Sequence, residues 1–139
     1  MRPRDIHHIG HAVDDLEAAV DAYERLFGAV TEYRETVPAQ GVEAVSLRVG
    51  SGRIELLRPL GADTPVGRFM ASRGPGMHHI AFGVDDVRAA LHHAAAAGAE
   101  LIDEEPHAGL FGLQVAFIHP SSVAGVLVEY VQLEGAVDG

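Results

Sequence analysis

The stretch Gly76-Met77-His78-His79-Ile80-Ala81-Phe82-Gly83-Val84-Asp85-Asp86 combines a short strand pattern, a histidine doublet at its start and a helix-start signal at its end. A second copy, Ile6-His7-His8-Ile9-Gly10-His11-Ala12-Val13-Asp14-Asp15, lies near the start of the chain. His8 precedes Asp15 by the same seven positions that separate His79 from Asp86. A repeat that holds a histidine at one place in each copy predicts two similar halves.

Each copy opens the same order of expected elements. The aspartate pair that closes each stretch can cap a helix, and Gly28 and Gly98 are natural helix stops. The strands expected are 6–13, 30–35, 40–49 and 53–57 in the first half, and 77–84, 99–103, 113–119 and 125–133 in the second. The pattern predicts an α+β fold of two β-α-β-β-β modules in one domain, 1–139. The modules are expected at about 6–60 and 76–133, with a connector at 61–75.

The composition limits the classes of function. With 139 residues, 47% of them hydrophobic, and a mean hydropathy of +0.11, the chain fits one ordinary globular domain. It has neither an apolar run near the roughly 18 residues of a membrane span nor a signal-peptide segment, so we expect a cytoplasmic protein without a membrane partner. The net charge of -10 argues against nucleic acid as a partner. Without cysteine, a metal site must use His, Asp or Glu.

Strand alternation separates the residues of the second copy into two faces. His79 shares one face with Ala81 and Gly83, whereas Ile80 and Phe82 share the other with His78. The bulky apolar set is expected to pack against a helix on the outer side of the sheet. His79 is therefore expected to point to the concave side, among small residues that leave room for a ligand.

The first copy divides in the same way. His8 shares the inner face with Gly10 and Ala12, and Ile9 points outward. His11 falls on the helix-facing side, so we expect it to be a packed histidine and not a ligand.

The last strand of each half carries one acid in an apolar run. Glu55 follows Ile54, and Glu129 follows Val128. Burying a lone carboxylate is costly unless it is paired or bound to a cation. Two imidazoles and two carboxylates suit a divalent metal, with water or substrate completing the shell. Any one of these residues alone is more often structural or solvent-exposed, and it is their repetition in register that favours a metal site.

Two runs of sequence are especially specific, Glu55-Leu56-Leu57-Arg58-Pro59-Leu60 and Gly76-Met77-His78-His79-Ile80-Ala81. Further runs lie at 40–42, 63–69, 103–106, 117–120 and 125–129. In these runs the chain resembles the methylmalonyl-CoA epimerases of the vicinal oxygen chelate superfamily, which also includes glyoxalase I, extradiol dioxygenases and antibiotic-resistance binding proteins. The resemblance extends over about 6–132.

The resemblance implies a metal-centred half-barrel of the glyoxalase/bleomycin-resistance type. It implies that His8, Glu55, His79 and Glu129 hold a divalent ion (Co, Mn, Zn, Ni or Mg). It also implies interconversion of (2R)- and (2S)-methylmalonyl-CoA by α-proton abstraction and reprotonation through a metal-stabilised enolate, with Glu129 serving one face. An acyl-CoA substrate and a homodimer are expected by analogy.

The group that serves the second face is an open question. Many members of the family carry a glutamate two residues after a Gly-Val pair, but here Glu43 comes one position early and Ala44 fills the expected place. A shift of one residue turns a strand side chain to the other face. Either a bulge returns Glu43 to the site as a catalytic acid or base, or Glu43 is an exposed acid and another group or water acts.

Other departures concern the substrate. The family often has lysine where Ser121 stands, and arginine in the loop that here contains His107, Leu110 and Phe111. The sequence therefore leaves the identity of the acyl-CoA substrate open. The alternatives are a glyoxalase I-type isomerisation of a thiol adduct and a metal-free binding or resistance protein of the same fold. Retention of all four ligand types argues against the metal-free alternative.

Overall fold

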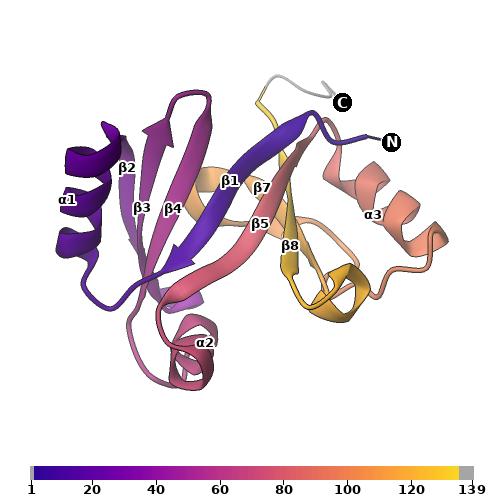
Figure 1. The fold of residues 1–139 in the computed structure, drawn as a ribbon. Coiled ribbons are helices and arrows are strands. Elements are labelled where there is room, and N and C mark those ends of the chain that lie inside the picture. Colours follow the sequence, from indigo (N-terminus) through magenta and orange to yellow (C-terminus); the bar gives the residue numbers. More distant parts are fainter. Residues whose placement is uncertain (1, 135–139) are drawn as a thin grey trace. The chain divides into compact units, whose positions relative to one another are not determined.

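The computed structural model describes residues 2–134, which form two compact units. The first unit comprises residues 8–78, and the second comprises residues 79–134 together with the residues before His8. Both boundaries fall inside strands, β1 (Asp5–Ala12) and β5 (Gly76–Val84) (Figure 1).

The first unit contains a four-stranded sheet. Its further elements are α1 (Leu16–Phe27), β2 (Val30–Val37), η1 (Pro38–Gln40), β3 (Val42–Val49), β4 (Gly52–Pro59) and α2 (Pro65–Arg73). The strand order is β2-β3-β4-β1, in which β1 runs parallel to β4 and the other neighbours are antiparallel. The β-α-β-β-β order predicted for the first half is confirmed.

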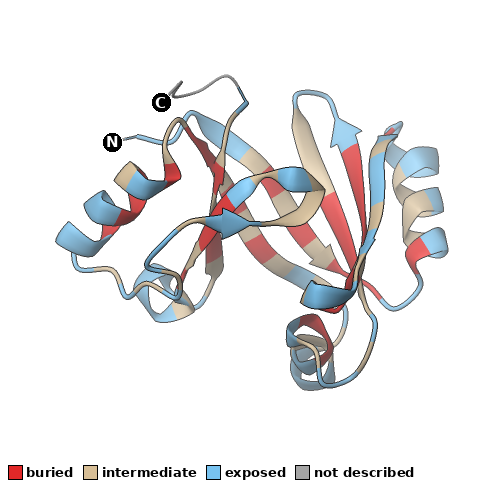
Figure 2. Ribbon diagram, turned by 180° about the vertical axis from the view of Figure 1, so that it is seen from behind, coloured by how far each residue is buried: buried red, intermediate tan, exposed pale blue. Residues whose placement is uncertain are grey.

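Helix α1 begins and ends at the residues expected from the sequence. The Asp15 carboxylate accepts a hydrogen bond from the backbone N–H of Ala18 at 3.0 Å. Gly28 ends the helix with a φ of 66°, a conformation that glycine adopts without steric cost. The apolar side of α1 packs on the sheet around Leu47 and Leu56. Figure 2 shows buried residues along the strands and exposed residues on the outward side of the helix.

The second unit repeats this plan. Its elements after β5 are α3 (Val87–Ala96), β6 (His107–Ala108), η2 (Leu110–Gly112), β7 (Gln114–Ile118), η3 (Pro120–Val123) and β8 (Leu127–Gln132). The order is β5-β8-β7-β6, with β5 parallel to β8 and the remaining pairs antiparallel. Asp86 caps α3 by accepting from the N–H of Ala89 at 3.2 Å.

The prediction of a strand at 99–103 is wrong. Within that stretch Leu101 forms an isolated bridge to Ile118, and the paired strand β6 begins only at His107. The physical reason is that the Asp103 carboxylate accepts the N–H of Phe117 at 2.9 Å, in place of a backbone carbonyl. Pro106, which has no N–H to donate, then precedes β6.

The contacts of β5 separate its two faces as alternation predicts. Phe82 packs with Ala94 of α3, whereas Ala81 packs with Val115 and Val131 on the opposite side. Since His79 and Ala81 are two residues apart in one strand, His79 lies on the face away from α3. The predicted inward direction of His79 within its own sheet is confirmed.

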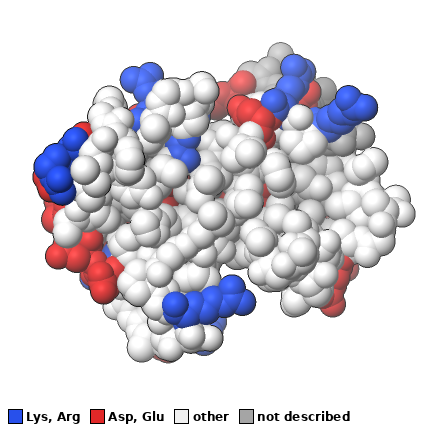
Figure 3. Space-filling view, viewed as in Figure 1, with Lys and Arg blue, Asp and Glu red and all other residues white. Residues whose placement is uncertain are grey.

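The described part of the chain has no helix that is both long and apolar enough to span a membrane. On the face drawn in Figure 3, arginine side chains stand in separate groups, some of them beside acidic side chains. The ion pairs of the described residues include Arg25 with Asp21 on α1, at 3.4 Å, and Arg4 with Asp85 in the second unit, at 3.0 Å.

Candidate metal centre

In the second unit, His79 and Glu129 form a buried pair. The parallel ladder of β5 and β8 sets Ala81 beside Glu129, and His79 precedes Ala81 by two residues on the same face. His79 Nε2 lies 3.4 Å from Glu129 Oε1, and the two side chains are only 4% and 9% exposed. The register of two strands, which are far apart in sequence, therefore brings an imidazole and a carboxylate together.

In the first unit, His8 and Glu55 repeat this arrangement. Here Gly10 of β1 stands beside Glu55 of β4, and His8 again precedes that partner by two residues. His8 Nε2 lies 3.4 Å from Glu55 Oε2, and both side chains are buried. The same strand register thus produces the same buried His–Glu pair in each unit.

The chemistry and spacing of each pair fit half of a divalent-metal site. Imidazole nitrogen and carboxylate oxygen are ligands for first-row divalent ions. Two ligand atoms that are each about 2.1 Å from a common ion stand roughly 3.0 to 3.4 Å apart, and both pairs have a separation of 3.4 Å. His8, His79 and Glu129 are buried residues of metal-ligating type.

Ring contacts connect His79 with Phe117 and Phe117 with His107 within the second unit. Phe117 of β7 is the strand partner of Glu129, and its ring meets the His79 ring edge-on, with centroids 6.2 Å apart. The His107 ring stacks on Phe117 at 6.3 Å, and Asp103 lies 3.2 Å from His107 Nε2. The Phe117 ring therefore restricts the orientation of the His79 imidazole.

Glu43 lies on the face of its strand opposite to that of Glu55, so of the two alternatives for this residue the structure favours the one in which another group or water acts. The ladder between β3 and β4 is unbroken from Val42 to Val49, so no bulge turns Glu43 toward the face that carries Glu55. Its carboxylate accepts hydrogen bonds from Arg58 at 3.0 Å and Arg34 at 3.2 Å. These bonds, that from Arg58 foremost, lower the pKa of the Glu43 carboxyl group below its ordinary value.

His11 is a packed histidine, as the sequence predicted. Its Nδ1 lies 2.8 Å from the hydroxyl of Tyr23 on α1, and the two rings meet edge-on. Burial lowers the pKa of His11, because the charged imidazolium is disfavoured away from water.

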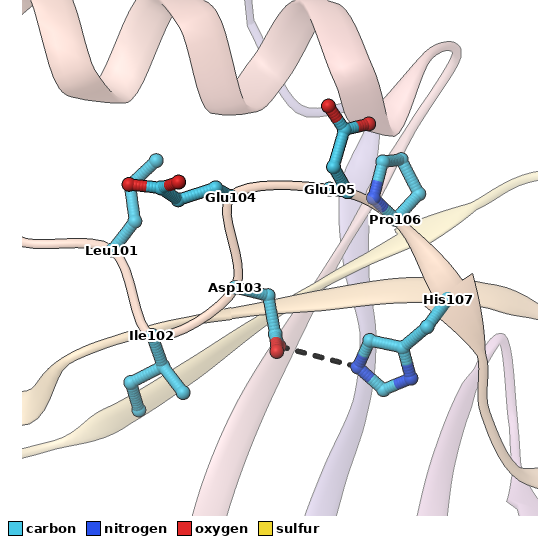
Figure 4. Close-up of a pocket in the computed structure, with 7 residues that line it drawn as sticks. All are labelled: Leu101, Ile102, Asp103, Glu104, Glu105, Pro106 and His107. Atoms are coloured by element: carbon cyan, nitrogen blue, oxygen red, sulfur yellow. Dashed lines mark hydrogen bonds and ion pairs between the residues drawn. The ribbon is translucent and has the colours of Figure 1, made fainter.

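A pocket of about 710 Å³ lies along residues 101–107 of the second unit, where Asp103 bonds to His107 (Figure 4). None of the predicted site residues lines it. The sequence reasoning missed the Asp103–His107 pair and also Ser46, which is buried beside Glu55 on β3. Strand alternation offered a signal for Ser46, but the pairing of β3 with β4 was needed to place it beside Glu55.

The chain belongs to the glyoxalase/bleomycin resistance protein/dioxygenase superfamily, whose family model matches residues 7–117. Its fold is that of the vicinal oxygen chelate proteins. Within the superfamily it is a member of the methylmalonyl-CoA epimerase family of enzymes.

Three relatives support this membership. The mitochondrial methylmalonyl-CoA epimerase of Homo sapiens is 37% identical over 128 residues, which cover 91% of this chain and 73% of that protein. The ethylmalonyl-CoA/methylmalonyl-CoA epimerase of Cereibacter sphaeroides is 36% identical over 130 residues, covering 92% and 97%. A solved methylmalonyl-CoA epimerase in complex with methylmalonyl-CoA and NH4+ is 33% identical, with a TM-score of 0.91 and coverage of 99% and 100%.

Proposed function

We propose that this chain is a metal-dependent epimerase that interconverts (2R)- and (2S)-methylmalonyl-CoA. The observation that carries the proposal is the duplicated buried His–Glu pair, His8 with Glu55 and His79 with Glu129. Membership of the epimerase family and the methylmalonyl-CoA bound to a relative support the acyl-CoA substrate.

In this proposal the two pairs together hold one divalent ion. When bound, such an ion supplies positive charge where the thioester oxygen becomes negative. The imidazole nitrogens of His8 and His79 and the carboxylate oxygens of Glu55 and Glu129 are the donors. A site of four protein ligands leaves room in an octahedral shell for substrate oxygens.

Glu129 is the proposed acid and base for one face of the substrate. Its carboxylate takes the proton from the carbon between the thioester and the free carboxylate, and the bonding pair delocalises into the thioester carbonyl. A proton then arrives at the opposite face of the planar carbon, which inverts its configuration. Buried Ala81 and Val131 lie on the same sheet face as Glu129 and limit the access of water.

The experiment follows epimerisation and isotope exchange together. The protein is stripped with a chelator, reloaded with Co²⁺ and incubated with (2R)-methylmalonyl-CoA in heavy water. We expect the (2S) epimer to appear with deuterium at the α-carbon, and only in the reloaded sample. Full activity after stripping would contradict the metal role. Inversion without deuterium would contradict the proton-transfer mechanism, and turnover of a thiol adduct alone would favour glyoxalase-type chemistry.

A further inference from the structure

Inversion at one carbon requires proton transfer on both faces, and this inference rests on the proposed function. Glu129 serves one face in that proposal. Glu43 cannot serve the other from the α1 side of the sheet, where Arg34 and Arg58 hold it. The second acid or base must come from a strand face that also carries a proposed metal ligand.

The register of the first unit identifies the residues on that face. Val45 and Leu56 pack against α1, so Ala44 of β3 and Glu55 of β4 point to the opposite side. On β2, Glu35 is the direct strand partner of Ala44. Directly opposed residues in an antiparallel pair point to the same face. Glu35 therefore shares the face of Glu55.

The neighbours of Glu35 on β2 confirm this orientation. Arg34 is the partner of Val45 and forms an ion pair with Glu17 of α1, so it lies on the helix side. Glu35, the next residue, consequently points away from α1. Glu35 is half-buried, which suits a carboxyl group that has to meet a bound substrate.

The strand partner of Glu35 has a short side chain. The Ala44 side chain is fully buried and ends at its Cβ. In a directly opposed pair the two Cβ atoms are about 4.5 to 5.5 Å apart, so the longer Glu35 side chain can extend across Ala44 toward the strand of Glu55. The nearby acid Glu32 accepts a hydrogen bond from Arg53 at 3.0 Å.

We propose that Glu35 is the catalytic acid and base for the face of the substrate opposite Glu129. In one direction Glu129 removes the α-proton and the protonated Glu35 carboxyl group delivers its own proton to the other face, forming the new C–H bond. In the reverse direction the two carboxylates exchange roles. The glutamate acts from β2, across the small Ala44, and not from β3.

The test is Glu35→Gln, measured by inversion and by solvent exchange in heavy water. Glu129 remains in this variant, so the epimer whose proton faces Glu129 should still exchange deuterium with retention of configuration. Inversion should fall by about 10²- to 10⁴-fold, the usual contribution of a positioned acid or base. The other epimer should neither exchange nor invert.

Two matched variants control for charge and for strand stability. Glu43→Gln removes an acid from the opposite face, and Glu32→Gln removes one from the same strand; both should invert substrate at the wild-type rate. Metal content and melting temperature of every variant are measured. Should Glu35→Gln fail to fold, Glu35→Asp replaces it. The aspartate carboxylate is too short to reach the substrate, so we expect the same result, exchange of one epimer without inversion.

Unchanged inversion in Glu35→Gln would overturn the assignment. Loss of both exchange and inversion in a folded, metal-loaded variant would also overturn it, because that pattern indicates a structural role. Failure of the proposed function is distinguishable, since the wild-type protein itself would then show neither exchange nor inversion.

Discussion

A buried histidine beside a buried glutamate is the smallest functional unit of this molecule. Taking an imidazole and a carboxylate out of water is costly, and removal of one partner leaves the other buried without compensation. The two pairs have the same 3.4 Å separation, yet only Glu129 is proposed both to bind metal and to move a proton. The two glutamates should therefore differ when each is replaced.

We expect both Glu55→Gln and Glu129→Gln to weaken metal binding, and Glu129→Gln also to slow exchange of the epimer whose proton faces residue 129. Each change removes one anionic ligand, so both should lower the affinity for Co²⁺ in calorimetric titration. At saturating Co²⁺, Glu55→Gln should recover exchange of the epimer that faces Glu129. Glu129→Gln should stay about 10²- to 10⁴-fold slower. Equal recovery of both variants would count against Glu129 as the proton-transfer residue.

Glu43→Gln should change stability with pH but not turnover. The hydrogen bonds from Arg58 and Arg34 lower the pKa of Glu43 from its ordinary value of 4.5, so the folded state favours the carboxylate. This contribution is fully present above about pH 4.5 and is lost as the pH falls through the lowered folded-state pKa. Wild type should therefore melt higher than Glu43→Gln at pH 7, and the difference should disappear in acid.

At the scale of elements, the two helices are held at their starts by equivalent aspartates. Asp15 caps α1 through Ala18, and Asp86 caps α3 through Ala89. The cap matters because the first turn of a helix has backbone N–H groups without partners inside the helix. The two copies of the repeat therefore share a helix-capping aspartate as well as a histidine.

Asp15→Ala and Asp86→Ala should each destabilise the protein by about 1 kcal/mol. Asp14→Ala is the matched control, because the neighbouring Asp14 is exposed and is not the capping residue. Urea unfolding monitored by circular dichroism measures the free energy of unfolding. An effect of Asp14→Ala as large as that of Asp15→Ala would show that charge, and not the cap, is responsible.

At the scale of the whole molecule, the proposal makes metal binding a property of both units. A ligand that binds only the folded state stabilises it, by about 2.7 kcal/mol at a free concentration of 100 times its Kd. If one ion is held by both pairs, its binding should depend on histidines that are 71 positions apart in the sequence, His8 and His79. The homodimer expected from the resemblance stays a prediction.

His8→Ala and His79→Ala should each remove most of the stabilisation by Co²⁺, and the double variant should lose little more. The measurement is melting temperature against Co²⁺ concentration, with metal content per chain determined in parallel. Wild type should bind one ion per chain. Two ions in wild type, with one retained by each single variant, would mean that the pairs bind separately.

The sequence predicted the features that depend on local spacing. The period of two in each strand indicated the directions of His79 and His11, and the Asp-Asp and glycine positions indicated where α1 begins and ends. The repeat also indicated that each half contributes one histidine and one glutamate from a later strand. These signals are readable because neighbouring residues determine them.

Only the tertiary structure decided what depends on pairing between distant segments. The register of β3 with β4 excluded a bulge at Glu43, which was one of the two alternatives left open by the sequence, and the register of β2 with β3 placed Glu35 opposite Ala44. The Asp103 carboxylate accepts the N–H of Phe117, and the strand expected at 99–103 does not form. The sequence alone determined which residues can carry chemistry. The fold decided which of them share a face, because strand partners are chosen by packing of the whole sheet and not by neighbours in the chain.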